Sequence, residues 1–328
     1  MIGWTSGLAA RHWRTSAFVV GVATLAFVPA AHADDVIPWL ARAANAARQL
    51  NYVGTIVYQH GTWTETSRLV HLNDQGEEFE KLVNLEGPAR EVIRSRGEVR
   101  CYYPDAKVIR IEPRTFRNAF PSLSPQQQKA LADFYNFRKA ETGRIAGLQT
   151  QAWVFEPKDG LRYGHKFWAD VATGLLVKAK IIDDGGRVND QFTFTEVTIG
   201  AKIDREMVKP TWPELPPDWT VRQWGKLEVD TKDTGWTVTR LPPGFVKIVE
   251  GFRRVQGVRE VAHLVYSDGL VAVSVFVEPI GGSRRPIGPS MQGGLSVYSR
   301  QLDENLVTVL GEVPAVTARQ IANSVAQK

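Results

Sequence analysis

Residues 263–279, HLVYSDGLVAVSVFVEP, form the most regular stretch of the chain. From Leu270 onward, every second position is a valine, namely Val271, Val273, Val275 and Val277. A period of two over this length predicts a strand with one buried face. The preceding residues alternate in the same way, and the intervening Ser-Asp-Gly is typical of a hairpin turn with a bulge at Gly269. This hairpin predicts the core of a small domain that presents a surface to another molecule.

Length and composition indicate an ordinary globular protein of about two domains. The chain has 328 residues, of which 43% are hydrophobic and 23% charged. Its net charge of +5 is spread along the sequence without runs of lysine or arginine, so nucleic acid is not an expected partner. A mild positive balance suits an acidic partner or an anionic lipid headgroup.

Residues 1–33 have the pattern of a secretory signal peptide. Arg11 and Arg14 precede a short apolar run, and Ala31-His32-Ala33 is a small-x-small cleavage site, so cleavage is expected after Ala33. The alternative is an uncleaved membrane anchor, for which the apolar run is short. The one cysteine, Cys101, excludes an internal disulfide. We expect a buried, inert thiol; a bridge to another molecule is the alternative.

Residues 34–209 are predicted to form the first domain. After a short opening helix, brief alternating segments end at Gly, Asp, Asn or Pro, which predicts an antiparallel meander curved into a barrel or half-barrel. A second helix is expected to begin at Ser124-Pro125, a favourable cap and first-turn pair. Leu131, Phe134 and Phe137 recur on one face of it. This helix is expected on the concave face of the sheet, either as the second layer of the core or as a lid over a cavity.

Prolines mark a boundary between the two domains. Residues 210–218 (PTWPELPPD) are predicted to be a stiff linker, because proline lacks an amide donor and restricts the backbone. Residues 219–328 then form the second domain, in which several strands precede a closing helix at about residues 315–325. This order predicts a small α+β domain. The glycine-rich stretch 281–294 is expected to be a mobile loop.

The sequence contains no recognisable catalytic or metal-binding motif. Its histidines and single cysteine do not occur at metal-ligand spacing, and neither a nucleophile elbow nor a phosphate-binding loop is present. We therefore expect neither an enzyme nor a cofactor. Tryptophan is abundant, with 10 residues in the full chain. These side chains are compatible with core packing and with a groove for an acyl chain or peptide.

Seven stretches in a fixed order resemble the RseB/MucB family of periplasmic regulators of the envelope-stress sigma factor. They cover nearly the whole predicted mature chain and comprise residues 52–58, 143–151, 162–178, 191–200, 241–245, 263–278 and 307–317. The resemblance implies a large first domain like the lipoprotein carriers LolA and LolB, which is an unclosed barrel with an apolar concavity. A linker joins it to a small second domain. The implied fold class is thus α+β, mostly β.

The resemblance also implies a function. Members bind the periplasmic part of a membrane-spanning anti-sigma factor of the RseA/MucA type and protect it from the site-1 protease. Lipopolysaccharide or another acyl-bearing ligand is implied to release it, and self-association into dimers or larger forms is implied as well. The alternative is a periplasmic lipid or lipoprotein carrier that uses the same concave sheet.

Neither proposed site has a sharp motif. Exposed aromatic and arginine side chains beside a mobile loop are typical interface anchors, so we expect partner contacts at Tyr266, Arg284, Arg285 and Tyr298. A lipid-responsive cavity is expected at Trp63, Phe120, Leu131 and Phe134.

Overall fold

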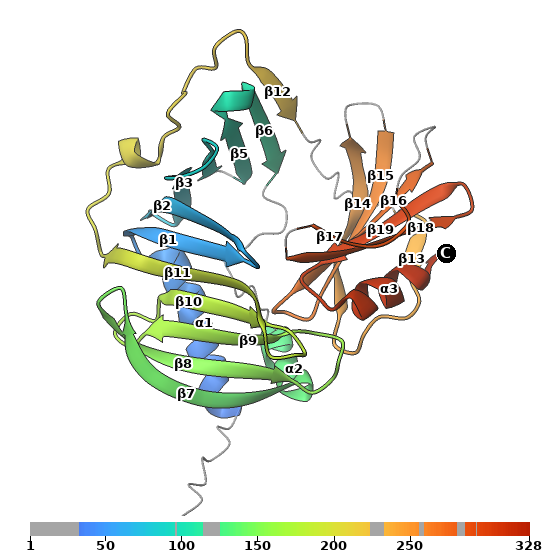
Figure 1. Cartoon of the computed structure of the whole chain (residues 1–328), viewed down its shortest axis with the longest axis horizontal. Helices are drawn as coiled ribbons and strands as arrows, with labels where there is room; N and C mark the ends of the chain where they lie inside the picture. Colours follow the sequence, from blue (N-terminus) through green and yellow to red (C-terminus); the bar gives the residue numbers. More distant parts are fainter. Residues whose placement is uncertain are drawn as a thin grey trace, which may run out of the picture.

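The computed structural model describes residues 33–95, 97–113, 125–223, 233–255, 259–280, 286–292 and 294–328. The predicted signal peptide therefore lies almost entirely outside the described residues, as do Phe120, Arg284 and Arg285. The described chain forms two parts, each built around one sheet (Figure 1). The larger sheet belongs to the first part and the smaller to the second.

The first sheet has twelve strands in the order β12-β6-β5-β4-β3-β2-β1-β11-β10-β9-β8-β7. Their bounds are β1 Tyr52–His60, β2 Trp63–Asp74, β3 Glu77–Asn84, β4 Glu91–Ser95, β5 Glu98–Tyr103, β6 Val108–Pro113, β7 Tyr135–Ile145, β8 Leu148–Pro157, β9 Gly164–Asp170, β10 Leu176–Ile182, β11 Val188–Ile199 and β12 Thr220–Gln223. Pairing is antiparallel except where β12 runs parallel to β6. Because β7 and β12 are the two edges of the described sheet, the curved sheet stays open (Figure 1). The predicted half-barrel is confirmed.

Two helices cover one half of the concave face. Helix α1 (Ala33–Gln49) and helix α2 (Pro125–Phe134) pack against the half that contains β7–β11 (Figure 1). Leu40 of α1 and Leu131 of α2 are fully buried in one cluster with Phe155 and Phe167 from the strands. Helix α2 is therefore the second layer of a core, which was one of the two alternatives left open by the sequence. The half formed by β1–β6 has no such helical cover among the described residues.

The proline-rich segment packs on the first domain. Trp212 stacks on Tyr102 with ring centroids 6.0 Å apart, and Trp219 contacts the same ring edge-on at 6.4 Å. Both tryptophans join the cluster around Ile109, on the face of β5 and β6 opposite the concavity. A 3₁₀ turn at Arg205–Val208 leads into this segment, and β12 follows it.

The second domain has a six-stranded sheet in the order β14-β15-β16-β19-β18-β17. Its elements are β13 Trp236–Val238, β14 Val246–Val255, β15 Arg259–Ser267, β16 Ala272–Pro279, β17 Gly288–Gln292, β18 Leu295–Leu302, β19 Asn305–Gly311, α3 Ala315–Asn323 and β20 Val325–Gln327. Helix α3 packs against β18 and β19, and β13 pairs with β20. The predicted α+β character of this domain is confirmed.

The hairpin predicted at residues 263–279 is present as β15 and β16. His263 lies opposite Phe276, and Ala262 opposite Val277. The predicted valine face is buried, since Val273 and Val275 have no exposed surface. Gly269 at the turn has a φ of 102°, a conformation that side-chain-bearing residues rarely adopt.

Candidate functional site: a cavity between the domains

A cavity of about 830 Å³ lies over the half of the concave face that the helices leave uncovered. Strands β1–β6 and β11 supply most of its wall, and β14–β16 of the second domain close it from the opposite side. The apolar lining from the first domain consists of Ile56, Leu82, Val92, Val99 and Phe192. Its volume is within the usual range for sites that bind one small ligand.

Strand alternation explains how these residues reach the cavity. On β4, Val92 and Arg94 line the cavity, whereas Ile93 points to the opposite face and packs in the cluster around Trp212. On β5, Cys101 likewise lines the cavity. The same period of two that defines the strands therefore places both apolar and charged side chains on the inner face.

The charged lining of the first domain is arranged in ion pairs. Arg90 pairs with Glu65, and Arg94 pairs with Glu80 of the neighbouring strand. The Nε atoms of both arginines are buried and have no hydrogen-bond partner among the described residues. Cys101 is only partly buried and lines the cavity, so the expectation of a buried thiol is wrong, although partial burial does raise the pKa of this thiol.

The second domain contributes a polar wall. The Nε2 atom of His263 lies 3.1 Å from Oγ of Ser274, and its ring stacks on Phe276 with centroids 4.2 Å apart. Burial, together with the charge of Arg253, lowers the pKa of His263 to about 3, so this imidazole is neutral. Burial also lowers the pKa of Arg253, because a guanidinium ion loses hydration at this position.

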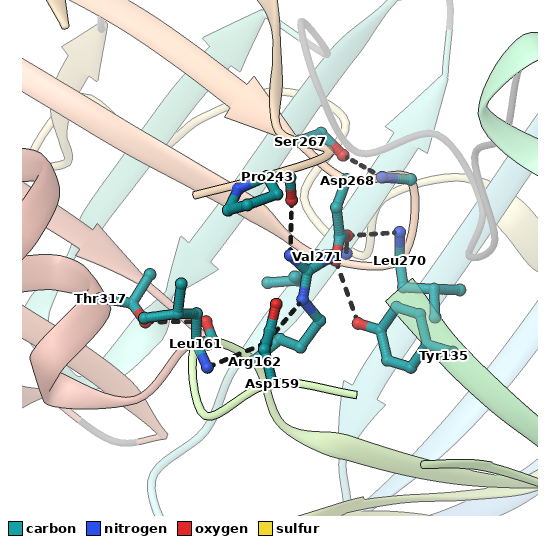
Figure 2. Close-up of polar contacts among 11 residues, drawn as sticks. Tyr135, Asp159, Leu161, Arg162, Pro243, Ser267, Asp268, Leu270, Val271 and Thr317 are labelled. Atoms are coloured by element: carbon teal, nitrogen blue, oxygen red, sulfur yellow. Dashed lines mark hydrogen bonds and ion pairs between the residues drawn. The ribbon is translucent and has the colours of Figure 1, made fainter. Parts of the chain in front are cut away.

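A buried polar cluster, here called the interdomain latch, also joins the domains (Figure 2). It consists of Tyr135, Arg162, Pro243 and Asp268. Nη1 of Arg162 donates to Oδ2 of Asp268 at 3.0 Å, and Nη2 donates to the carbonyl of Pro243 at 2.6 Å. The hydroxyl of Tyr135 donates to the same carboxylate oxygen at 3.0 Å. Both charged side chains are completely buried, so the pair lies in a region of low dielectric.

The tip of the β15–β16 hairpin supplies Asp268 to the latch and contacts the first domain. Oδ1 of Asp268 accepts hydrogen bonds from the amides of Leu270 and Val271, each at 3.0 Å, which fixes the turn. Leu270 joins the first-domain core beside α1 and α2. A further contact comes from Thr317 of α3, which donates to the carbonyl of Leu161 at 2.7 Å. The β15–β16 hairpin therefore packs in the core of the second domain and, through its tip, contacts the first domain.

The described residues that were predicted to line a lipid cavity lie in three different environments. Trp63 lines the cavity and is 52% exposed. The expectation for Leu131 is wrong, because this side chain is fully buried in the α1–α2 core. Phe134 packs at the domain interface against Arg162, whose guanidinium lies 4.8 Å from the ring centroid. It therefore does not line the cavity either.

Tyr266 is not the exposed anchor expected from the sequence. Its side chain is only 3% exposed and packs in the second-domain core, where burial raises its pKa to about 12. It points to the valine side of the hairpin, which packing against α3 covers. Tyr298 is half-buried against the same core. The latch residues were not expected from the sequence, since a lone arginine and an aspartate in a turn carry no local signal of a long-range pair.

The described residues contain no group of three or more His, Cys, Asp or Glu side chains that could hold a metal ion. No helix within the described ranges is both long and apolar enough to cross a membrane.

The fold and site define a two-domain β protein with a ligand-sized cavity at its domain interface. Models of the MucB/RseB N-terminal and C-terminal domains match residues 35–212 and 230–326, so the chain belongs to the MucB/RseB family.

Similar proteins span nearly the whole chain. The sigma factor AlgU regulatory protein MucB of Pseudomonas aeruginosa is 31% identical over 327 residues, covering 95% of this chain and 97% of that protein. The sigma-E factor regulatory protein RseB of Salmonella typhimurium is 28% identical, covering 92% and 94%. The crystal structure of MucB in complex with MucA(peri) matches with a TM-score of 0.68 and 29% identity, covering 90% of this chain and 99% of that one.

Proposed function

We propose that this protein is a periplasmic regulator that binds the periplasmic part of an RseA/MucA-like anti-sigma factor and protects it from site-1 proteolysis. The observation that carries the proposal is the likeness, over 90% of the chain, to a MucB structure solved with MucA(peri). The signal-peptide pattern of residues 1–33, with cleavage after Ala33, supports export.

The second domain is the proposed partner-binding part. Arg284 and Arg285 lie in the glycine-rich stretch next to the strand that pairs with Tyr298 at Pro289. These three residues remain our candidates for contacts with the anti-sigma factor. Tyr266 is removed from this set because its side chain is buried.

The lipid signal is proposed to act at the cavity between the domains. Trp63 is the sequence-predicted cavity residue that lines it. Lipopolysaccharide or another acyl-bearing ligand would insert an acyl chain along the apolar wall. Since both domains form this cavity, a ligand that alters their arrangement also alters the surface presented to the anti-sigma factor.

Calorimetric titration tests the proposal. The mature protein, residues 34–328, is titrated with the periplasmic segment of its anti-sigma factor, with and without lipopolysaccharide. We expect saturable binding that weakens when lipid is added, and slower site-1 cleavage of the bound segment. Absence of binding to the segment would contradict the proposal. Sedimentation velocity of the same sample tests the implied self-association.

A lipid or lipoprotein carrier is the second candidate, favoured by the open half-barrel and its cavity. A carrier would bind lipid saturably, pass it to an acceptor membrane and leave the anti-sigma segment unbound. The two functions are therefore separated by the same titration.

A further inference from the structure

The outer face of the first-domain sheet carries a group of lysines on β9 and β10. Phe167 points into the core beneath α1 and α2, so its neighbours Lys166 and Trp168 point to the opposite, convex face. The strand register places Lys178 of β10 opposite Trp168, and Lys180 opposite Lys166. The three lysines therefore share one area of the convex face, here called the lysine patch.

The three ammonium groups of the lysine patch lie around one indole ring. The Nζ atoms of Lys166, Lys178 and Lys180 are 4.8, 5.2 and 5.9 Å from the ring centroid of Trp168. A cation over an aromatic face is attracted by the ring, which holds the flexible lysine ends together in spite of their mutual repulsion. The ring itself is only 7% exposed. The patch therefore presents charge and almost no aromatic surface.

The patch carries more positive than negative charge. Lys166 pairs with Glu141 at 2.9 Å, but neither Lys178 nor Lys180 forms an ion pair with any described residue. The charges that act on Lys178 come from Lys180, Lys166 and Glu141. One carboxylate thus faces three cations, and the excess positive charge is available to an anionic partner.

The surroundings of the patch are polar or electrically balanced. On β11, Gln191 lies opposite Lys180 and Thr193 opposite Lys178. The ion pairs on the flanking strands are neutral overall, namely Arg138–Glu156 and Arg68–Glu196. The core of a protein–protein interface is depleted of charge and rich in aromatic residues, so this surface does not resemble one. It fits a partner that is recognised by charge.

A bilayer surface matches these features better than an enclosed anion. Lys178 and Lys180 do not line the interdomain cavity, and with Lys166 they stand side by side on one face of a sheet. Anionic lipid headgroups form an extended plane of phosphodiesters, and each lysine close to such a plane adds to the attraction. The second domain closes the cavity from the concave side, so it leaves the convex face uncovered.

We propose that the lysine patch docks the first domain on the anionic headgroups of a phospholipid bilayer. The inference rests on the proposed function for its location, because an anti-sigma factor that spans a membrane brings the bound protein to that surface. Attachment to such a partner raises the effective concentration of headgroups at the patch, so a contact that is weak alone becomes significant in the complex. The second domain and the cavity then face away from the membrane.

Sedimentation with vesicles tests the proposal in the mature protein, residues 34–328. One set of vesicles contains phosphatidylcholine alone, and the other also contains one third phosphatidylglycerol. Both are used at low and at physiological salt. Acetylation by an N-hydroxysuccinimide ester, followed by peptide mass spectrometry, shows which lysines the vesicles cover. Inorganic phosphate at matched ionic strength is the soluble competitor.

We expect binding to the anionic vesicles only, and weaker binding as the salt concentration rises, because salt screens the attraction. Joint replacement by Lys166→Gln, Lys178→Gln and Lys180→Gln should lower the partition coefficient about fivefold for each charge removed. Arginine at the same three positions keeps the charge and should restore binding. Anionic vesicles should slow acetylation of the three lysines, whereas inorganic phosphate should not.

The matched control removes three lysines elsewhere on the surface. Their side chains are 60%, 58% and 42% exposed, and the changes are Lys107→Gln, Lys209→Gln and Lys247→Gln. The two triple variants have the same net charge, so a difference between them reports the position of the charge. The control should bind anionic vesicles far more tightly than the patch variant. Circular-dichroism melts show that both variants are folded.

Equal binding of the wild-type protein to the two kinds of vesicle would overturn the inference, and this comparison needs no variant. Equal loss of binding in the two triple variants would also overturn it, because net charge alone would then explain the binding. Protection of the patch by inorganic phosphate or by the anti-sigma segment, but not by vesicles, would replace the bilayer with a soluble anion or a protein.

The same samples separate this inference from the proposed function. The patch variant should bind the anti-sigma segment as the wild type does, because the patch lies on the face opposite the second domain. Segment binding without vesicle binding refutes only this inference. Vesicle binding without segment binding refutes the proposed function and leaves the lysine patch intact.

Discussion

Arg162 and Asp268 are 106 positions apart in the sequence, yet their side chains meet in the latch with no exposed surface (Figure 2). Taking two charges out of water is unfavourable, and their attraction offsets this only when hydrogen bonds satisfy the remaining groups. Here Tyr135 and two backbone amides also donate to the carboxylate. The latch is therefore a geometry-dependent contact, formed only when the two domains are in place.

Asp268→Asn should destabilise the protein by about 1–3 kcal/mol, because it removes the fully buried one of the two carboxylates that pair with Arg162 and leaves only Asp159, at 3.1 Å. Urea unfolding followed by tryptophan fluorescence measures the change. The matched control is Glu156→Gln, which breaks the exposed Arg138–Glu156 pair at 3.2 Å and should change stability by less than about 1 kcal/mol. Similar effects of the two variants would show that the latch does not hold the domains.

A single residue, His165, should make the free energy of unfolding depend on pH in the acid range. It is buried beside Phe167, and burial lowers its pKa from 6.5 to about 4. The unfolded chain takes up this proton near pH 6.5 while the folded chain does not. The stabilisation is thus present above pH 6.5 and is lost as the pH falls towards 4, at about 1.4 kcal/mol per pH unit.

Replacement by a residue that does not titrate should remove this dependence. His165→Phe keeps an aromatic ring beside Phe167, and its unfolding free energy should fall less steeply than that of the wild type between pH 6.5 and 4. Urea titrations at several pH values measure the two slopes. Parallel slopes would mean that His165 is protonated in the folded protein.

At the scale of elements, one hairpin serves two cores. The valines of β16 fill the second-domain core, whereas Leu270 at the tip belongs to the core beneath α1 and α2. Gly244 on the adjoining loop has a φ of 82°, and a Cβ there would collide with the ring of Phe134. The interface is therefore close-packed as well as ion-paired.

Leu270→Glu should loosen the docked hairpin, because it introduces a charge into an apolar core. Opening of the interface should then increase the rate at which maleimide modifies Cys101. Ala272→Glu is the control, since Ala272 is exposed two positions further along the same hairpin. An unchanged rate in a folded Leu270→Glu protein would show that the hairpin tip does not govern access to the cavity.

At the scale of the whole molecule, the cavity and the latch exist only when both domains are present. A chain that ends at Gln223 keeps β12 but loses Asp268, Leu270 and the polar wall of the cavity. We expect this truncated protein to lose binding to the anti-sigma segment and to melt at a lower temperature than the mature protein. Calorimetric titration and a circular-dichroism melt measure both effects.

A folded truncated protein that bound the segment at full strength would place the partner site in the first domain. The mature protein with Asp268→Asn is the companion sample. This variant retains all elements of the second domain but lacks the Arg162–Asp268 ion pair. Comparing its segment binding with that of the truncated protein therefore separates loss of the partner surface from loss of the latch.

Local patterns in the sequence determined the strands, the hairpin and the two fold types, and the resemblance of seven ordered stretches indicated the family. Period-two alternation and turn residues act between near neighbours, and this is why residues 263–279 were assigned correctly. Trp63, which was proposed for the cavity without a sharp motif, does line it. The sequence also placed α2 on the concave sheet without deciding between a second layer and a lid.

Tertiary packing decided which side chains reach a surface. Tyr266 is buried by α3 and the neighbouring strands, and Leu131 by α1, so neither occupies the site proposed for it. Arg162 and Asp268 become partners only when two domains dock, because their contact depends on residues far apart in the chain. Local sequence fixes the direction in which a side chain points, but burial and long-range ion pairs depend on what the rest of the molecule packs against it.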